Sequence, residues 1–412
     1  MSEAKRLAPL WKFAEVSPPT PEFTNLSHND EVTFIPLEDV WPTYAANDFQ
    51  TVNWEARLTG YTPFRCGDLL LPKVTPTVTH GRTMIADITT NLGVASTEVY
   101  TVRARPSTDP RWLAYLLVGN EFLGFAGASV QGTGGLKRIS TQFVESYPLP
   151  NATPDEQRAI ADYLDRETTE IDGMRTDLDE MERLLEERRV SIIQRHVLPE
   201  NGTYTRIKLV ADVSLGKTVQ KTQKHASEVL RNYVRAAHIR PHGRLVLDDK
   251  PMWFTPNELK QLALEAGDVL VVEGGAGYGR SVYLREELPG WGFQNHVIRV
   301  RPWTGASGRF IDYTIRAHYG AGLIDILADG ATIPGLSSDK ARELPILNVS
   351  YTEQRRIADE IDRETAEIGS MLEDITKLRD LLAERRTALI SAAVSGQIDI
   401  PVSPTHKDEA HA

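Results

Sequence analysis

Apolar side chains recur every three or four residues along two long stretches of the chain. They follow a 4-3 spacing between positions 160 and 192, and the same spacing returns between 357 and 389. A sustained 3.5-residue period places one apolar stripe along a helix and predicts pairing with a second helix in a left-handed coiled coil. The expected stripes are Ile160, Leu164, Ile171, Met174, Leu178, Met181, Leu185 and Ile192 in the first stretch, and Ile357, Ile361, Ile368, Met371, Ile375, Leu378, Leu382 and Leu389 in the second.

Both stretches carry signals for helix ends. Residues 153–156, Thr-Pro-Asp-Glu, supply an N-cap, a proline at the first helical position and the glutamate of a capping box. Pro199 and Gly202 are expected to end the first helix, and Gly396 the second. Each helix is then about 60 Å long at about 1.5 Å per residue. The simplest partner for each stripe is the other helix, and pairing between two chains is the alternative.

The two stretches also share their sequence. EQRAIADYLDRET at 156–168 returns as EQRRIADEIDRET at 353–365, an offset of 197 residues. Flanking matches follow in the same order: GDLLLP (67–72) with GDVLVV (267–272), VRARP (102–106) with IRVRP (298–302), RWLAY (111–115) with RFIDY (309–313), and the proline of ESYPLP with that of RELPIL. This order favours an internal duplication over two unrelated domains with convergent helices.

Each copy opens with a variable domain of short β-type runs followed by a helix. The runs are EVTFIPL, DLLLPKV, RTMIADI and EVYTVRA in the first copy, and NYVRAAHI, DVLVVEG, RSVYLRE and HVIRVRP in the second. This pattern predicts an α+β fold. We expect a first domain at 1–152, a helix at 153–198, a second domain at 199–350, a helix at 351–397 and a flexible tail at 398–412.

Charge and composition narrow the setting. The formal net charge of −11 at first argues against a nucleic-acid partner. Most of the excess acid, however, lies in the two helical repeats, and the segment between them is net basic. With one cysteine, Cys66, the chain can form no intrachain disulfide. No apolar run is long enough to span a bilayer, and the N-terminal residues have no apolar core of signal-peptide length. We therefore expect a cytoplasmic protein.

Catalytic motifs are weak. ADVSLGKT at 211–218 resembles a phosphate loop, but no helical period follows it. Asp248 or Asp249 with Glu258 and Lys260 imitates a nuclease metal site, but the first copy has no counterpart, so these residues are interpreted as solvated charge. No metal-ligand, nucleophile-elbow or dinucleotide motif occurs, nor does the tetrad that adenine methyltransferases use. We expect no catalysis and no metal.

Basic and polar loops offer better candidates, for nucleic-acid binding. The second domain begins with a basic segment. Further on, a glycine loop carries Tyr278 and Arg280, and QNH at 294–296 offers groups that can bind base edges. The candidate DNA contacts are Lys73, Thr75, Thr77, His80, Arg82, Ser129, Gln131 and Lys137 in the first domain, and Lys217, Lys221, Lys224, Arg235, Tyr278, Arg280, Asn295 and His296 in the second. Ordinary solvated loops are the alternative.

Two divergent domains, each followed by a nearly identical E-Q-R-x-I-A-D helix, resemble the DNA-specificity subunit of a Type I restriction–modification system. The resemblance covers nearly the whole chain and is weakest over residues 1–60. It implies two target-recognition domains, each reading one half of a bipartite site in double-stranded DNA, on antiparallel spacer helices related by a pseudo-two-fold axis. It also implies a subunit without catalysis of its own.

The same resemblance implies partners. The helices would dock two methyltransferase subunits, which would carry S-adenosylmethionine, and restriction subunits would add the nuclease and translocase. The residues expected to face these partners are Gln157, Arg158, Asp162, Gln354, Arg355 and Asp359. Two other classes remain as alternatives: a coiled-coil scaffold that binds proteins, and a stand-alone nuclease built on Asp249, Glu258 and Lys260.

Overall fold

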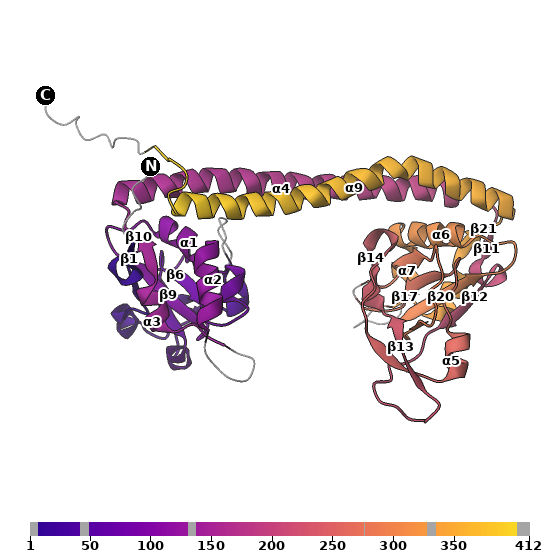
Figure 1. The fold of residues 1–412 in the computed structure, drawn as a ribbon, viewed down its shortest axis with the longest axis horizontal. Coiled ribbons are helices and arrows are strands. Elements are labelled where there is room, and N and C mark those ends of the chain that lie inside the picture. Colours follow the sequence, from indigo (N-terminus) through magenta and orange to yellow (C-terminus); the bar gives the residue numbers. More distant parts are fainter. Residues whose placement is uncertain (1–6, 42–48, 131–136, 276, 328–334, 402–412) are drawn as a thin grey trace. The chain divides into compact units, whose positions relative to one another are not determined.

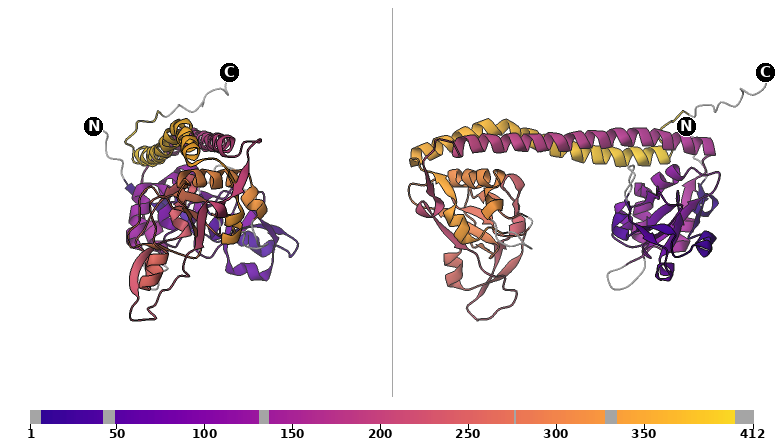
Figure 2. Two further views of the ribbon diagram at one scale, coloured as in Figure 1. Left: turned by 90° about the vertical axis from the view of Figure 1, so that its right-hand side faces the viewer. Right: turned by 180° about the vertical axis from the view of Figure 1, so that it is seen from behind.

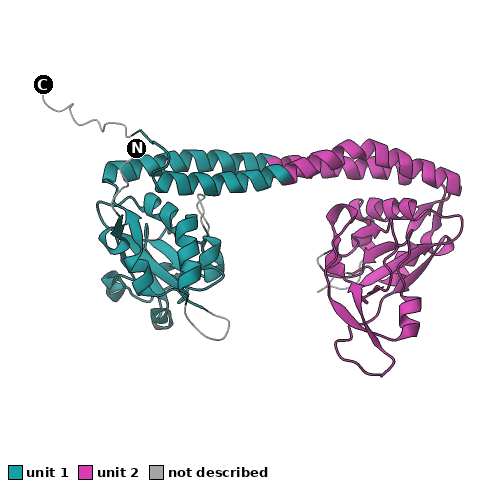
Figure 3. Ribbon diagram, in the orientation of Figure 1, with its two compact units in different colours: residues 1–177, 377–412 teal, residues 178–376 magenta. Residues whose placement is uncertain are grey.

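The computed structural model describes residues 7–41, 49–130, 137–275, 277–327 and 335–401 (Figure 1). The chain forms two compact units: unit 1 contains residues 1–177 and 377–412, and unit 2 contains residues 178–376 (Figure 3). Each unit holds one mixed α/β domain, so the α+β prediction is confirmed. The two longest helices, α4 (Pro154–Val197) and α9 (Tyr351–Val394), each contribute one half to unit 1 and the other half to unit 2.

The domain of unit 1 contains two four-stranded sheets and one strand pair. The first sheet has the order β2-β9-β6-β7 and is antiparallel throughout; the second has the order β4-β3-β8-β5, with β3 and β8 parallel. The strands are β1 (Leu7–Pro9), β2 (Ala14–Val16), β3 (Glu31–Ile35), β4 (Thr51–Asn53), β5 (Thr62–Arg65), β6 (Leu69–Pro72), β7 (Met84–Ile85), β8 (Leu92–Ala95), β9 (Val99–Ala104) and β10 (Pro148–Pro150). The helices are α1 (Pro110–Val118), α2 (Asn120–Ser129) and α3 (Thr141–Ser146).

Unit 2 repeats this topology, except that its second sheet has three strands and that it contains the additional pair β14-β15. Its main sheet has the order β12-β20-β17-β18, and its second sheet, β16-β13-β19, again contains a parallel pair. The strands are β11 (Tyr204–Arg206), β12 (Ala211–Leu215), β13 (Val229–Val234), β14 (Ile239–Arg240), β15 (Arg244–Leu245), β16 (Pro251–Phe254), β17 (Val269–Val272), β18 (Ser281–Tyr283), β19 (Gly292–Phe293), β20 (Val297–Pro302) and β21 (Pro345–Leu347). The helices are α5 (Pro256–Gln261), α6 (Gly308–Gly320), α7 (Leu323–Leu327) and α8 (Ser338–Glu343). The shared strand order confirms the internal duplication.

The repeated sequence motifs around the sheets form a buried ion pair. In unit 1 the guanidinium of Arg103 donates to both carboxylate oxygens of Asp68, each at 2.8 Å. In unit 2 Arg301 and Asp268 make the same bidentate pair at 2.7 and 2.8 Å. Asp68 and Asp268 are almost completely buried. A buried carboxylate must be paired to be tolerated, which explains why the G-D motif recurs together with an arginine on the neighbouring strand. The strand register places Arg301, the second arginine of IRVRP, at the position of Arg103, the first arginine of VRARP, so the expected match of these two motifs is shifted by two residues.

The ends of the long helices follow the sequence signals. Thr153 and Glu156 form the expected capping box, with the Thr153 amide donating to the Glu156 carboxylate (2.7 Å) and the Glu156 amide donating to Thr153 Oγ1 (3.3 Å). The first helix ends two residues before Pro199, and the second ends two residues before Gly396, which has a φ of 75°. No helix in the described part of the chain is both long and apolar enough to cross a membrane.

Within each unit, one half of α4 lies beside the opposite half of α9 (Figure 1, Figure 2). In unit 1, Arg386 of α9 pairs with Asp172 of α4 at 2.5 Å. In unit 2, Arg195 near the end of α4 pairs with Glu364 near the start of α9. Early residues of one helix thus meet late residues of the other, which makes the pairing antiparallel in both units.

The buried face of the helices differs from a simple 4-3 stripe. In the first half of α4 the buried positions include Ala161 and Thr168 beside Ile160, Leu164 and Ile171, because this half contacts both a domain and the facing half of α9. Four expected seam residues are exposed instead: Met174, Met181, Met371 and Leu378. The buried residue near the end of α4 is Ile193, whereas Ile192 is only half-buried. A continuous seam through the middle of the helices was therefore a wrong prediction at these positions.

Candidate nucleic-acid interface

One end of the main sheet of unit 1, the edge at which β6 ends and β9 begins, joins three separate stretches of chain. The backbone amide of Lys73, just after β6, donates to the carbonyl oxygen of Glu98, just before β9 (2.8 Å). The amide of Ile139 donates to the carbonyl oxygen of Lys73 (2.9 Å), and Val74 and Arg138 form an isolated β-bridge. These bonds fix the side chains of all three stretches at one place on the domain.

Unit 2 has the same backbone frame with different side chains. The amide of Glu273 donates to the carbonyl oxygen of His296 (3.0 Å), and the amide of Leu336 donates to that of Glu273 (2.6 Å). Glu273 thus occupies the place of Lys73, so a positive side chain is replaced by a negative one. His296 occupies the place of Glu98, so a carboxylate is replaced by an imidazole. A constant frame with variable side chains is suited to reading two different base sequences.

Two candidate DNA contacts of unit 1 are engaged inside the domain. Lys73 Nζ donates to a neighbouring backbone carbonyl oxygen (2.8 Å) and lies 4.6 Å from the ring centre of Tyr100, and burial lowers the pKa of Lys73. The guanidinium of Arg82 donates to backbone carbonyl oxygens of residues 37–40 and stacks over Trp41 at 4.2 Å. Their contacts give Lys73 and Arg82 a role in holding this edge together.

The remaining candidates of unit 1 lie on the loops around this edge. Thr75 is tied to the second loop, because its backbone amide donates to the carbonyl oxygen of Lys137 (2.9 Å). The side chains of His80 and Lys137 are exposed, and those of Thr75, Thr77 and Ser129 are half-buried. Gln131 lies outside the described residues.

In unit 2, Lys217 does not fit the prediction of a free phosphate contact. Its Nζ donates to Glu258 Oε2 (2.6 Å) and lies 5.4 Å from the ring centre of Phe254, and the side chain is only 12% exposed. The preceding Gly216 packs so closely that a Cβ there would lie 2.2 Å from the carbonyl oxygen of Gln294. The charge of Lys217 is therefore neutralised inside the domain.

Lys221 and Lys224 are exposed on a loop at 216–228 that one buried carboxylate holds in place. The Glu228 carboxylate accepts from the side-chain amide of Gln220 (2.9 Å) and from the backbone amide of Lys224 (2.6 Å). These hydrogen bonds, above all the one from Gln220, lower the pKa of Glu228 to about 2. The loop thus presents two lysines to solvent, as phosphate contacts require.

Replacing Glu228 with glutamine is expected to loosen this loop. Because the pKa of Glu228 is lowered from 4.5 to about 2 on folding, its stabilisation is complete above pH 4.5 and is lost as the pH falls towards 2. Hydrogen exchange of residues 216–228 should accelerate over that window in the wild type, beyond its intrinsic pH dependence, and not in E228Q.

Trypsin offers a second measurement at neutral pH. Cleavage after Lys221 and Lys224 should be several-fold faster in E228Q than in the wild type or in the exposed control E287Q. Equal cleavage of all three proteins would show that Glu228 does not hold the loop.

Arg235 and Tyr278 are also engaged within unit 2. The guanidinium of Arg235 forms an ion pair with Asp248. The hydroxyl of Tyr278 donates to the Asp325 carboxylate, which raises the pKa of Tyr278. Both side chains position neighbouring loops in the described conformation.

Arg280, Asn295 and His296 are more open. Arg280 forms no ion pair with any described residue. Asn295 is half-buried, and its backbone amide donates to the carbonyl oxygen of Lys217 (2.9 Å). His296 is exposed, with Nδ1 at 3.4 Å from a Glu273 carboxylate oxygen. Asn295, His296 and Glu273 together form the polar part of the edge in unit 2.

The acidic residues that imitate a nuclease site are used elsewhere. Asp248 accepts a hydrogen bond from His238 (2.8 Å), Asp249 accepts one from Asn232 (2.9 Å), and Glu258 forms the capping box of α5. In the described part of the chain, no group of three or more His, Cys, Asp or Glu side chains is placed to hold a metal ion.

Two glutamines of the repeated motif are buried and join each domain to its helix. Gln157 Oε1 accepts from the amide of Asp109 (3.0 Å), and its Nε2 donates to the carbonyl oxygen of Ala152 (2.9 Å). Gln354 binds the amide of Ser307 (2.9 Å) and a backbone carbonyl oxygen (3.1 Å) in the same way. The two side chains are 2% and 4% exposed, so they belong to an internal joint, which corrects their expected role as partner contacts.

An ionic contact completes this joint in unit 1. The guanidinium of Arg111, on α1, lies 2.8 Å from an oxygen of Asp162 and 2.7 Å from an oxygen of Asp165, both on α4. The hydroxyl of Tyr115 donates to the second oxygen of Asp165 (2.8 Å). Asp162 was expected to face a partner, and the structure also gives it this internal ion pair.

Unit 2 repeats the ionic contact. Arg309, on α6, pairs with Asp359 and with Asp362 (2.7 Å) of α9, and the hydroxyl of Tyr313 donates to Asp362. Sequence reasoning missed Arg309, Tyr313 and their counterparts as docking residues. The signal was present in the recurring R-x-x-x-Y of RWLAY and RFIDY, next to the recurring D-x-x-D of the helices.

Arg158 and Arg355 remain on the surface. Arg158 is exposed with a long ion pair to Asp155 (3.6 Å), and Arg355 is exposed beside the ring of Tyr351 (5.9 Å). They occupy the same place in the two repeats, so both are open to a partner.

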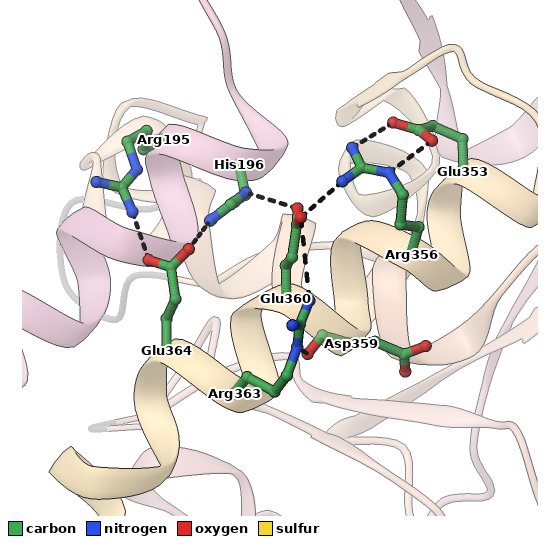
Figure 4. Close-up of polar contacts among 8 residues, drawn as sticks. All are labelled: Arg195, His196, Glu353, Arg356, Asp359, Glu360, Arg363 and Glu364. Atoms are coloured by element: carbon green, nitrogen blue, oxygen red, sulfur yellow. Dashed lines mark hydrogen bonds and ion pairs between the residues drawn. The ribbon is translucent and has the colours of Figure 1, made fainter.

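An ionic network joins α4 to α9 in unit 2 (Figure 4). His196 Nε2 lies 2.9 Å from Glu364 Oε1, and its Nδ1 lies 3.8 Å from Glu360 Oε2. The hydrogen bond from His196 lowers the pKa of Glu364. The positions of Arg195 and His196 in the first repeat correspond to two alanines in the second, at 392 and 393, so the sequence provides this contact once.

Comparison with known proteins adds two sequence matches. No family model matches the chain. The chain is 28% identical over 152 residues to the Type I restriction enzyme EcoEI specificity subunit of Escherichia coli, and 28% identical over 156 residues to the EcoAI specificity subunit of the same organism. These matches cover 36% and 37% of this chain, and the chain spans about a quarter (25% and 26%) of the length of these relatives.

A solved structure shares the fold over nearly the whole chain. It is described as the structural basis underlying complex assembly and conformational transition of the type I R-M system, and its TM-score is 0.70 at 14% identity, with 96% of this chain and 99% of that chain covered. Because its sequence identity is only 14%, this structural match shows a shared fold. The two sequence matches to specificity subunits cover about a third of this chain. The resemblance to DNA-specificity subunits of Type I restriction–modification systems, inferred from the repeated helices, is confirmed.

Proposed function

We propose that this chain is the sequence-specific DNA-binding subunit of a Type I restriction–modification complex, that it reads a bipartite site, and that it has no catalysis of its own. The observation that carries the proposal is the repeated unit. Each domain is held to its helix by the same glutamine and arginine–aspartate contacts, whereas the loops at the sheet edge differ. Positioning is thus constant, and the surface available for recognition is variable.

The chemistry of the variable edges supports DNA as the ligand. Lys137 in unit 1 and Lys221 and Lys224 in unit 2 are exposed cations on loops, as phosphate contacts require. Asn295 and His296 add polar groups that can bind base edges. The acidic helices are better suited to protein partners than to DNA.

Exposed apolar residues on the helices support two copies of one partner. Met181 and Leu184 of α4 are 51% and 50% exposed, and their counterparts Leu378 and Leu381 of α9 are 48% and 58% exposed. Large apolar side chains left exposed at the same positions of both repeats indicate a protein contact made twice. We assign this contact to two methyltransferase subunits, which would supply S-adenosylmethionine chemistry, with restriction subunits joining the same complex in the cytoplasm.

Co-expression with the methyltransferase subunit tests this function. Sequencing of methylated adenines in the host genome should reveal one bipartite motif that depends on both chains, and purified specificity chain alone should transfer no methyl group. A gel shift with genomic fragments should improve when the methyltransferase subunit is present. Absence of any motif, with the partner still bound, would instead favour a protein-binding scaffold.

A further inference from the structure

Unit 2 contains a cavity of about 290 Å³ between α4 and its domain. Its walls come from the second half of α4, the turn after β14, the start of β18 and the end of α6. Four of the lining residues are arginines, and one, Glu186, is the single carboxylate among the described residues that line it. The arginines are Arg189, Arg240, Arg280 and Arg316.

The four arginines that line this cavity outnumber the two carboxylates that pair with them, Glu186 and Asp312. Arg240 and Arg280 form no ion pair with any described residue. Among the described residues, Arg189 forms an ion pair only with Glu186, at 3.9 Å. Arg316 pairs with Asp312 (2.6 Å), but its Nε atom is buried without a hydrogen-bond partner. Grouped cations and an unpartnered buried donor are costly unless an anion or water compensates them.

The backbone is shaped to bring the turn at 241–243 against Arg316. Gly243 has a φ of 68°, and a Cβ at this position would lie 1.6 Å from an Arg316 guanidinium nitrogen. His242 also has a positive φ, 65°, and its Nδ1 lies 2.7 Å from Glu186 Oε2. His242 thus engages Oε2 of the one carboxylate that lines the cavity, whereas Oε1 of Glu186 is buried without a hydrogen-bond partner among the described residues.

Unit 1 has no excess of unpaired arginines at the positions that correspond to this cavity. Arg82, which corresponds to Arg280, is satisfied by backbone carbonyl oxygens and by Trp41. Arg386, which corresponds to Arg189, pairs with Asp172 at 2.5 Å. The counterpart of Arg316 is Val118. The uncompensated arginines are therefore particular to unit 2 and do not follow from the repeated architecture.

We propose that this cavity binds a phosphate group. Guanidinium groups bind phosphate through paired N–H donors, and several of them together favour a multiply charged anion over chloride. The volume exceeds that of one phosphate, and Val190, Ile193 and Tyr319 provide apolar wall for whatever carries it. The phosphate can belong to the DNA backbone, which rests on the proposed function, or to a small free anion, which does not.

The test compares the full-length wild type with R240Q/R280Q. Neither arginine forms an ion pair with the described part of the chain, so the double variant should fold with an unchanged Tm in chloride buffer. The matched control is R175Q/R188Q, which removes two exposed arginines of α4 outside the cavity. Thermal unfolding is measured with inorganic phosphate and with pyrophosphate, against sodium chloride at equal ionic strength. Binding to a random-sequence duplex is measured as a function of salt.

For a free anion, phosphate or pyrophosphate should raise the Tm of the wild type and the control by on the order of 2 °C, and this rise should vanish in R240Q/R280Q. For DNA, the slope of log K against log salt should fall by about 1 to 2 in R240Q/R280Q and clearly less in the control, since each phosphate contact contributes about 0.9.

An unchanged Tm response together with an unchanged slope would overturn the proposal. If the wild type shows no preferred DNA sequence at all, the proposed function fails, and the phosphate measurement still decides the nature of the cavity.

Discussion

Replacing Gln354 with leucine is expected to loosen unit 2 and leave unit 1 intact. Leucine fills a similar volume but leaves the buried amide of Ser307 and the carbonyl oxygen of Val349 without their partner. Two unpaired backbone groups cost on the order of 2–4 kcal/mol of unfolding free energy. Hydrogen exchange resolved by peptide should therefore accelerate strongly in residues 204–347 and only slightly in residues 7–150.

The first repeat offers the matched experiment. Q157L should produce the opposite pattern, because Gln157 makes the same two bonds in unit 1. The exposed Gln142 provides a control for the glutamine-to-leucine change itself. If Q157L and Q354L loosened both units to the same extent, these glutamines would not be local joints.

Exchanging residues 7–150 for the corresponding domain of a related chain is expected to change one half of the recognised DNA sequence completely and leave the other half unchanged. The structure explains why such an exchange is possible. β1 and β10 pair antiparallel, with Leu7 opposite Pro150, so the domain enters and leaves at one place. The incoming domain must supply an arginine and a tyrosine equivalent to Arg111 and Tyr115 to dock on α4.

The second domain allows the reciprocal exchange. β11 and β21 pair in the same way, with Tyr204 opposite Leu347, so residues 204–347 form the second cassette. Sequencing of methylated adenines in cells that also express the methyltransferase subunit reads both halves at once. A change in both halves after a single exchange would show that the two domains do not read independently.

Much of the fold could be predicted because the chain carries each pattern twice. All eight expected β-type runs contain a strand, and the ends of α4 and α9 lie within a few residues of the capping and stop signals. The strands that were missed, such as β4 and β5, have three or four residues and pair only with distant segments. Strands this short show no measurable period of their own.

The exposure of Met174 and Met181 could not be predicted from spacing. A heptad pattern tells which side chains share a stripe, but burial depends on how many neighbours cover that stripe. Near its start α4 contacts a domain and another helix, whereas near its middle the described contacts leave methionines open to solvent. Apolar residues that stay exposed look the same in sequence as residues that are buried in a core.

The candidate site shows the same difficulty for charge. Lys217 and Lys221 are four residues apart in one basic segment, yet Lys217 is neutralised by Glu258, 41 positions further along the chain, and Lys221 is exposed. Sequence gives the positions of charges, whereas their pairing depends on tertiary contacts. Gln157 was misjudged for a related reason, since repetition in both helices fits an internal joint as well as a shared partner.

Unit 1 is built from two segments that are far apart in the sequence, residues 1–177 and 377–412, and this affects how it folds during synthesis. Ile390, Ala393 and Val394 of α9 lie in the same apolar core as Ile160 and Leu164 of α4. The ribosome therefore makes the first domain early but supplies the last part of its core only after all of unit 2 has been translated. Unit 2, which is continuous from 178 to 376, can complete its own contacts first. We expect the order of folding in the cell to run opposite to the order of the domains in the sequence.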